Sequence, residues 1–178
     1  MESGWPASLI RDVPDFPAEG VVFKDITPLL DDGDALRWAA DELADSFADA
    51  AVDRVVGVEA RGFILGAAVA YRLGCGFVPF RKPGKLPYRT RSVDYQLEYG
   101  TASLEAHTDA LAPGQRVLIV DDVLATGGTA AAAVELAGSG GAEVVGAGFL
   151  VELGFLGGRA KLSDDWPVIS LFCFGDDG

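Results

Sequence analysis

The chain has 178 residues, of which 49% are hydrophobic and 23% are charged, a composition typical of a folded protein with one sizeable core. Its net charge of −13 argues against general nucleic-acid binding, which requires a basic face. The longest uncharged run, Val123 to Val134, is too short to span a bilayer, which takes about 20 apolar residues. The first residues lack the basic and apolar pattern of a secretory signal. We therefore expect a single cytoplasmic domain over residues 1–178, with neither a nucleic-acid nor a membrane partner.

The first half of the chain predicts alternating helices and strands. Residues 34–50 predict an amphipathic helix, because apolar side chains recur there at helical spacing between acidic ones. Short apolar runs at 54–58 and 76–80 predict buried strands, and the apolar stretch 62–73 between them predicts a second helix. Residues 93–106 alternate in places and predict a short antiparallel pair.

The second half continues this alternation. Residues 116–120 predict a strand that is apolar on both faces, as expected at the centre of a parallel sheet. Residues 128–137 predict a helix, and 143–151 and 168–174 predict two further strands. The order of these elements predicts an α/β fold with a mainly parallel central sheet and flanking helices.

Sites in such folds lie at the carboxyl ends of the strands, which directs attention to the turns after Val58, Phe80 and Val120. After Val120 the sequence reads DDVLATGGT. Two adjacent carboxylates, Asp121 and Asp122, thus end a buried strand, and a loop rich in Gly and Thr then opens a helix. The carboxylates can accept hydrogen bonds from sugar hydroxyls or hold a hydrated Mg²⁺.

The loop after the acid pair has the features of an anion site. Its backbone N–H groups and the following helix N-terminus attract negative charge, and its glycines allow close approach of the backbone. The Walker pattern and the G-x-G-x-x-G pattern are both absent. The layout therefore predicts a site for a sugar phosphate, with the phosphate bound by Ala125, Thr126, Gly127, Gly128 and Thr129.

A local positive charge stands out on this acidic chain. Residues 81–91 read RKPGKLPYRTR and contain no acid, so they indicate an anionic small-molecule ligand or, alternatively, a solvated surface loop. The turn after Val58 offers Glu59, Ala60, Arg61 and Gly62, and a backbone turn with one arginine suits a second phosphate cluster or, alternatively, a surface ion pair.

These segments resemble the type I phosphoribosyltransferases. VLIVDDVLATGGT, residues 117–129, is similar to the motif by which that family binds 5-phosphoribosyl 1-pyrophosphate (PRPP). VEARGF, RKPGKLP and QLEYG are similar to the pyrophosphate loop, the following segment and the catalytic loop of the members that use adenine. DFP and GVVFKDI near the N-terminus are similar to their base-binding hood, expected within about residues 1–33.

The resemblance implies a fold, an activity and residue roles. It implies the type I phosphoribosyltransferase fold with a small N-terminal hood, the substrates adenine and PRPP, Mg²⁺ as cofactor and a homodimer. Asp121 and Asp122 would bind ribose and reach Mg²⁺ through water, with the metal held mainly by substrate. The pyrophosphate would be bound by Glu59, Ala60, Arg61, Gly62, Arg81, Lys82 and Lys85, the base by Val22, Phe23, Lys24 and Val123, and catalysis would involve Glu98, Arg61 and Lys85.

Several alternatives stay open at this point. Glu98 would handle protons of the adenine ring or would only help its loop to close. A related enzyme for hypoxanthine, guanine or xanthine would share the acid pair and the loop but use a different hood. A regulator that binds PRPP would need an added DNA-binding segment, and a phosphotransfer protein with Asp121 as phosphoacceptor would leave the Gly/Thr loop unexplained.

Overall fold

The computed structural model describes residues 5–96 and 100–175. The chain forms two compact units, residues 1–39 and residues 40–178, and each is described by itself. Among the described residues, no helix combines the length and the apolar character needed to cross a membrane.

The N-terminal unit is built around an antiparallel hairpin. After a 3₁₀ turn at Ala7–Leu9, strand β1 (Arg11–Pro14) pairs with β2 (Val22–Asp25), and Asp12 lies opposite Lys24. A short helix, α1 (Thr27–Asp31), follows, and α2 (Gly33–Asp45) begins in this unit. The sequence motifs indicated a base-binding hood here but did not predict β1, β2 or α1, whereas the helix that became α2 was predicted.

The larger unit contains a five-stranded sheet in the order β4-β3-β7-β8-β9, with every neighbouring pair parallel. The strands are β3 (Arg54–Val58), β4 (Gly76–Phe80), β7 (Arg116–Leu124), β8 (Glu143–Leu153) and β9 (Val168–Phe174). The central strand is β7, which is why residues 117–120 are fully buried. The predicted parallel α/β architecture is confirmed.

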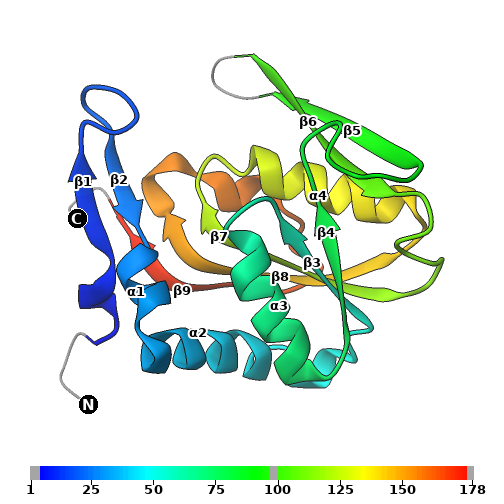
Figure 1. The fold of residues 1–178 in the computed structure, drawn as a ribbon, viewed down its shortest axis with the longest axis horizontal. Helices are drawn as coiled ribbons and strands as arrows, with labels where there is room; N and C mark the ends of the chain where they lie inside the picture. The colour runs from blue at the N-terminus through cyan, green and yellow to red at the C-terminus, as the bar shows by residue number, and fades with distance from the viewer. Residues whose placement is uncertain (1–4, 97–99, 176–178) are drawn as a thin grey trace. The chain divides into compact units, whose positions relative to one another are not determined.

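Helices cover both faces of this sheet (Figure 1). Helix α3 (Gly62–Leu73) packs on β3, β4 and β7, and α4 (Gly128–Ser139) packs on β7 and β8 from the opposite face. A second hairpin, β5 (Thr90–Gln96) with β6 (Thr101–His107), lies over α4 and confirms the antiparallel pair predicted in this region.

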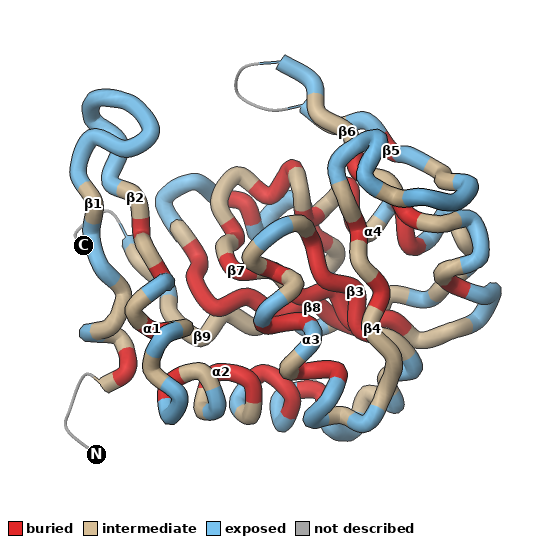
Figure 2. Tube along the Cα trace, in the orientation of Figure 1, coloured by how far each residue is buried: buried red, intermediate tan, exposed pale blue. Residues whose placement is uncertain are grey.

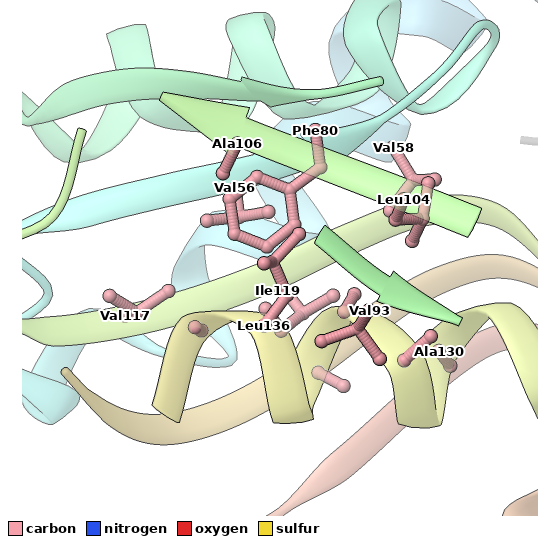
Figure 3. Close-up of a cluster of buried hydrophobic side chains, with 14 of the residues drawn as sticks. Val56, Val58, Phe80, Val93, Leu104, Ala106, Val117, Ile119, Ala130 and Leu136 are labelled. Atoms are coloured by element: carbon pink, nitrogen blue, oxygen red, sulfur yellow. The ribbon is translucent and has the colours of Figure 1, made fainter. Parts of the chain in front are cut away.

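The core reflects the period-2 alternation of the strands. Figure 2 shows the buried residues concentrated in β3, β7 and β8, with the exposed residues mostly in the hairpins and outer connections. Figure 3 shows Val56, Phe80 and Ile119 meeting Leu136 of α4 and Val93 of the hairpin. The strand residues between them face the other way, where α3 and the end of α2 pack. The sheet is therefore a rigid layer, and its carboxyl edge positions the loops that follow.

Several predicted boundaries were wrong. Helix α4 ends at Ser139 and not at residue 137, and β8 ends at Leu153 and not at residue 151. The helix predicted over 34–50 ends at Asp45, because Phe47 turns into the core beside Gly146 and a separate 3₁₀ turn forms at Ala48–Ala50. The strand predicted over 116–120 continues to Leu124, since its pairing with β8 extends past the acid pair. Asp121 and Asp122 therefore lie on the strand itself, and the turn begins at Ala125.

Candidate active site

The acid pair occupies the last part of β7, at the carboxyl edge of the sheet. The carboxylate of Asp121 accepts a hydrogen bond from the backbone N–H of Asp122 at 2.9 Å. Burial and the neighbouring charge of Asp122 raise the pKa of Asp121 well above its ordinary value, although Arg61 opposes this shift. The side chain of Asp122 is only 10% exposed and forms an ion pair with Arg61 at 2.5 Å. One buried carboxylate, Asp122, one half-buried carboxylate, Asp121, and the guanidinium of Arg61 thus lie close together.

The 125–129 loop follows directly and ends as the first turn of α4. Gly127 is the N-cap of that helix with φ of 77°, a conformation that favours glycine. Across residues 5–96 and 100–175, the amides of residues 126–129 donate to no protein acceptor. These are the amides that a helix start leaves without an internal partner. The loop can therefore direct a set of N–H dipoles at an anion.

The turn between β3 and α3 lies beside the acid pair. The peptide bond between Glu59 and Ala60 is cis. A Cβ on Gly62 would lie 2.5 Å from the Asp121 carboxylate, so the start of α3 packs directly against that side chain. Arg61 reaches Asp122 from the same turn. The groups predicted for pyrophosphate and for ribose are therefore neighbours, with Arg61 at the boundary between them.

The first part of the basic segment is organised around Glu59. The carboxylate of Glu59 accepts from Lys85 Nζ at 2.5 Å, from Arg81 Nε at 3.1 Å and from the backbone N–H of Lys82 at 3.1 Å. Its side chain is 7% exposed, whereas that of Lys85 is 49% exposed. Burial alone would raise the pKa of Glu59, but these three donors lower it to about 2. Glu59 is thus an acceptor, charged at neutral pH, that holds three of the predicted pyrophosphate residues together.

The site fits a divalent metal that keeps most of its ligands outside the protein. Among the described residues, no three His, Cys, Asp or Glu side chains are grouped closely enough to hold a metal. The acid pair offers two carboxylates, and Mg²⁺ is often bound through one or two carboxylates plus substrate phosphates and water.

The remaining predicted site residues lie in three places. Val22, Phe23 and Lys24 are on β2 of the N-terminal unit, where Phe23 stacks edge-on against Phe16 and the buried ammonium of Lys24 pairs with Asp12 at 2.8 Å. Val123 is on β7 of the larger unit and is half-buried. Glu98 lies outside the described residues.

Two contacts of the 125–129 loop were not predicted. The hydroxyl of Thr129 lies 3.5 Å from that of Tyr95 on β5. Gly158, in the connection between β8 and β9, packs its backbone against Ala125 and Gly127. Little in the sequence indicated the second contact: residues 154–162 show only a short Gly-rich connection that contains Arg159 and Lys161.

Comparison with known proteins agrees with this geometry. Residues 28–173 match the family described as phosphoribosyl transferase domain, the class that the parallel sheet, acid pair and anion loop define. Adenine phosphoribosyltransferase from Geobacter metallireducens is 59% identical over 167 residues, covering 94% of this chain and 97% of that protein. The enzyme of that name from Acidothermus cellulolyticus is 60% identical over 156 residues, covering 88% of each.

A solved structure extends the similarity to three dimensions. The crystal structure of adenine phosphoribosyltransferase from Thermoanaerobacter pseudethanolicus has a TM-score of 0.91 and 54% identity, over 94% of this chain and 97% of that one. The chain therefore belongs to the phosphoribosyltransferase family, in the branch of the adenine phosphoribosyltransferases. Its fold is the type I phosphoribosyltransferase fold.

Proposed function

We propose that the chain transfers the 5-phosphoribosyl group of PRPP to adenine, giving AMP and pyrophosphate in purine salvage. The observation that carries this function is the position of the 125–129 amides at the start of α4, immediately after the acid pair at the end of β7. Phosphate oxygens need hydrogen-bond donors, whereas sugar hydroxyls can donate to carboxylates. This edge of the sheet offers N–H donors and carboxylate acceptors within a few residues of each other.

Ribose 5-phosphate binding is assigned to that edge. The phosphate accepts hydrogen bonds from the amides of residues 126–129, helped by the hydroxyls of Thr126 and Thr129 and by the helix dipole. Asp121 and Asp122 accept hydrogen bonds from the ribose hydroxyls. Their negative charge also stabilises the positive charge that develops on the ribose ring as the bond at C1 breaks.

Pyrophosphate departure is assigned to the neighbouring basic groups. The C1–O bond breaks with its electron pair leaving on the pyrophosphate, which therefore gains charge. Arg61, Lys82 and Lys85 neutralise that charge. Asp121 and Asp122 would hold Mg²⁺ through water, with the substrate supplying most of its ligands, and the metal would supply Lewis-acid stabilisation of the same leaving group. We assign Glu59 a different task from direct pyrophosphate contact: it holds Arg81 and Lys85 in place, because its carboxylate accepts from both.

Base recognition is assigned to Val22, Phe23 and Lys24 of the N-terminal unit and to Val123 of the larger unit. Phe23 and Val123 supply apolar surface for the purine. The ammonium of Lys24 is buried against Asp12, which favours recognition through backbone groups of β2. Backbone groups distinguish the amine of adenine, a donor, from the carbonyl of hypoxanthine, an acceptor.

A ring nitrogen of adenine forms the new bond to C1 and loses its proton. Glu98 either accepts this proton or only helps its loop to close and exclude water. Glu98→Gln separates these roles. A loss of kcat of about 100-fold supports proton transfer, and an unchanged kcat removes Glu98 from the chemistry.

Three further properties belong to the same proposal. We propose one phosphoribosyltransferase domain over residues 1–178, with the β1–β2 hairpin and α1 as the hood. We also propose a homodimer and a cytoplasmic location, on the resemblance to this family and on the sequence pattern.

One assay tests the function. The protein is incubated with PRPP, Mg²⁺ and each purine base in turn, and released pyrophosphate is measured. Release with adenine alone supports the proposal. Release with guanine or hypoxanthine but not adenine would move the chain to the related enzymes for those bases. No release with any base would contradict the activity.

A further inference from the structure

The connection between β8 and β9 lies against the 125–129 loop from behind. Gly158, the first residue of a 3₁₀ turn (Gly158–Lys161), is buried. A Cβ on Gly158 would collide with the carbonyl oxygen of Ala125 and lie 2.7 Å from the backbone nitrogen of Gly127. A Cβ on Gly127 would in turn lie 2.9 Å from the carbonyl carbon of Gly158. The two backbones therefore touch with no side chain between them, and the position of one fixes the position of the other.

The next residue, Arg159, fastens this turn to the sheet. Its Nε donates to Glu152 Oε1 at 3.0 Å, and its Nη2 donates to the second carboxylate oxygen. Its Nη1 donates to the carbonyl of Val168 at 2.7 Å. Ser170 on β9 also donates to Glu152, at 2.7 Å. Arg159 thus joins the turn to β8 and β9 at once.

Glu152 is well placed to be the anchor. It lies on β8 opposite Leu124, the residue that precedes the 125–129 loop, and its side chain is 9% exposed. Hydrogen bonds from Arg159 and Ser170 lower the pKa of Glu152 although burial opposes this, so the carboxylate is charged at neutral pH. A two-pronged arginine–carboxylate pair fixes direction as well as distance, which a lysine cannot do.

We propose that Glu152, Arg159 and Ser170 are positioning residues for the 5-phosphate: they hold Gly158 against the 125–129 loop and so fix the direction of its amides. This inference rests on the proposed function of the loop. In this inference, the connection between β8 and β9 controls how tightly the 5-phosphate of PRPP is bound, although it lies far from the 125–129 loop in the sequence. Recognition of the base does not depend on it.

The alternative is that the network only stabilises the fold. The two roles differ in what they change. A positioning role raises KM for PRPP and the Kd for ribose 5-phosphate in protein that remains folded, and it leaves KM for adenine unchanged. A role in stability alone lowers the melting temperature and leaves both ligand constants of the folded protein as they were.

The experiment compares matched variants. Gly158→Ala forces the two backbones apart, and Gly138→Ala in α4 is its control because a Cβ there meets nothing within 4 Å. Arg159→Lys keeps the charge but loses the two-pronged geometry. Arg37→Lys is its control, since Arg37 forms an exposed pair with Asp34. For each protein, KM for PRPP and for adenine, kcat, the melting temperature and calorimetric binding of ribose 5-phosphate are measured.

We expect Gly158→Ala to raise KM for PRPP and the Kd for ribose 5-phosphate by about tenfold or more, and Arg159→Lys to raise both by about threefold. KM for adenine and both controls stay within about twofold of the wild type. Ligand constants at wild-type level in folded Arg159→Lys and Gly158→Ala would overturn the inference. If Gly158→Ala does not fold, Arg159→Lys and Ser170→Ala decide it. If the wild type binds ribose 5-phosphate but does not turn over adenine, the proposed function is contradicted. The positioning role can still be tested in that case, by comparing the Kd for ribose 5-phosphate of each variant with that of the wild type.

Discussion

The 125–129 loop and the stretch Arg81–Lys85, which we propose to bind the two anionic groups of PRPP, are built in different ways. The loop carries no charged side chain, and its amides are fixed by a helix start and by the backbone of Gly158 behind it. Arg81–Lys85 carries three cations on a turn, and two of them are bound to the buried carboxylate of Glu59. The loop thus presents backbone dipoles in fixed directions, whereas the positions of Arg81 and Lys85 depend on their ion pairs with Glu59.

This difference suits the two anionic ends of PRPP. The 5-phosphate stays on the sugar through the reaction, so a fixed binding site serves it well. The pyrophosphate changes its charge and leaves, so cations on a turn with an internal partner suit it better. The expected consequences can be tested region by region.

The largest effect is expected at the ion pair between Asp122 and Arg61. Asp122→Asn removes the charge that pairs with Arg61. In the proposed function, the same charge would face the positive charge that develops on ribose. We expect kcat/KM for PRPP to fall by about 100-fold, the usual scale for one lost electrostatic contact in a transition state. Steady-state kinetics measure it, with Asp164→Asn, an exposed carboxylate, as the control. Activity within about threefold of the wild type would separate the acid pair from catalysis.

Glu59→Gln tests whether Arg81–Lys85 depends on its partner. Removing this buried acceptor should lower the free energy of unfolding by about 2 kcal/mol, the scale for charge-assisted hydrogen bonds. Added pyrophosphate should narrow the difference in melting temperature between variant and wild type, because it supplies a replacement anion. A difference that pyrophosphate leaves unchanged would show that Arg81–Lys85 and Glu59 act only in the fold.

A pair of single-contact variants compares the two kinds of donor. Lys85→Met removes an exposed cation, and Thr129→Val removes a neutral hydroxyl; each should weaken PRPP binding by about fivefold, or ~1 kcal/mol. Salt screens exposed charges and affects neutral donors much less. The effect of Lys85→Met should therefore shrink between low and high salt, while that of Thr129→Val persists. Equal salt dependence in the two variants would remove the distinction between the regions.

The smallest effect concerns pH. The folded pKa of Glu59 is about 2, below its ordinary value of 4.5, so its carboxylate stabilises the fold above about pH 4.5. This contribution is lost as the pH falls toward 2. The melting temperature of Glu59→Gln should therefore decline less steeply than that of the wild type over this range. Glu143→Gln, whose side chain is exposed, serves as the control. Parallel curves for wild type and Glu59→Gln would contradict the shift.

The sequence predicted what depends on local pattern. Strands β3, β4 and β9 and helix α3 have the predicted bounds, because each is a short apolar run between clear turn signals. The acid pair and the following loop were also found, since the residues of that motif are contiguous.

Long-range packing decided the features that were missed. The end of α2 depends on where Phe47 meets Gly146, and the length of β7 depends on its pairing with β8. The hydrogen bonds of the Glu59 carboxylate with Arg81 and Lys85 were not predicted, because nothing local shows which way that side chain turns. The contact of Gly158 with the 125–129 loop joins segments that are far apart in the chain. Such pairings follow from topology, and no local pattern records them.

The most direct test of the proposed 5-phosphate site is to measure the NMR signals of the backbone amides of residues 126–129. Two-dimensional ¹⁵N–¹H spectra are recorded while ribose 5-phosphate is added to the ¹⁵N-labelled protein, with ribose as the control. We predict that the amide signals of residues 126–129 shift most and that ribose alone leaves them nearly unchanged. Shifts concentrated in residues 81–85, with the amides of 126–129 unmoved, would contradict the assignment of this loop as the 5-phosphate site.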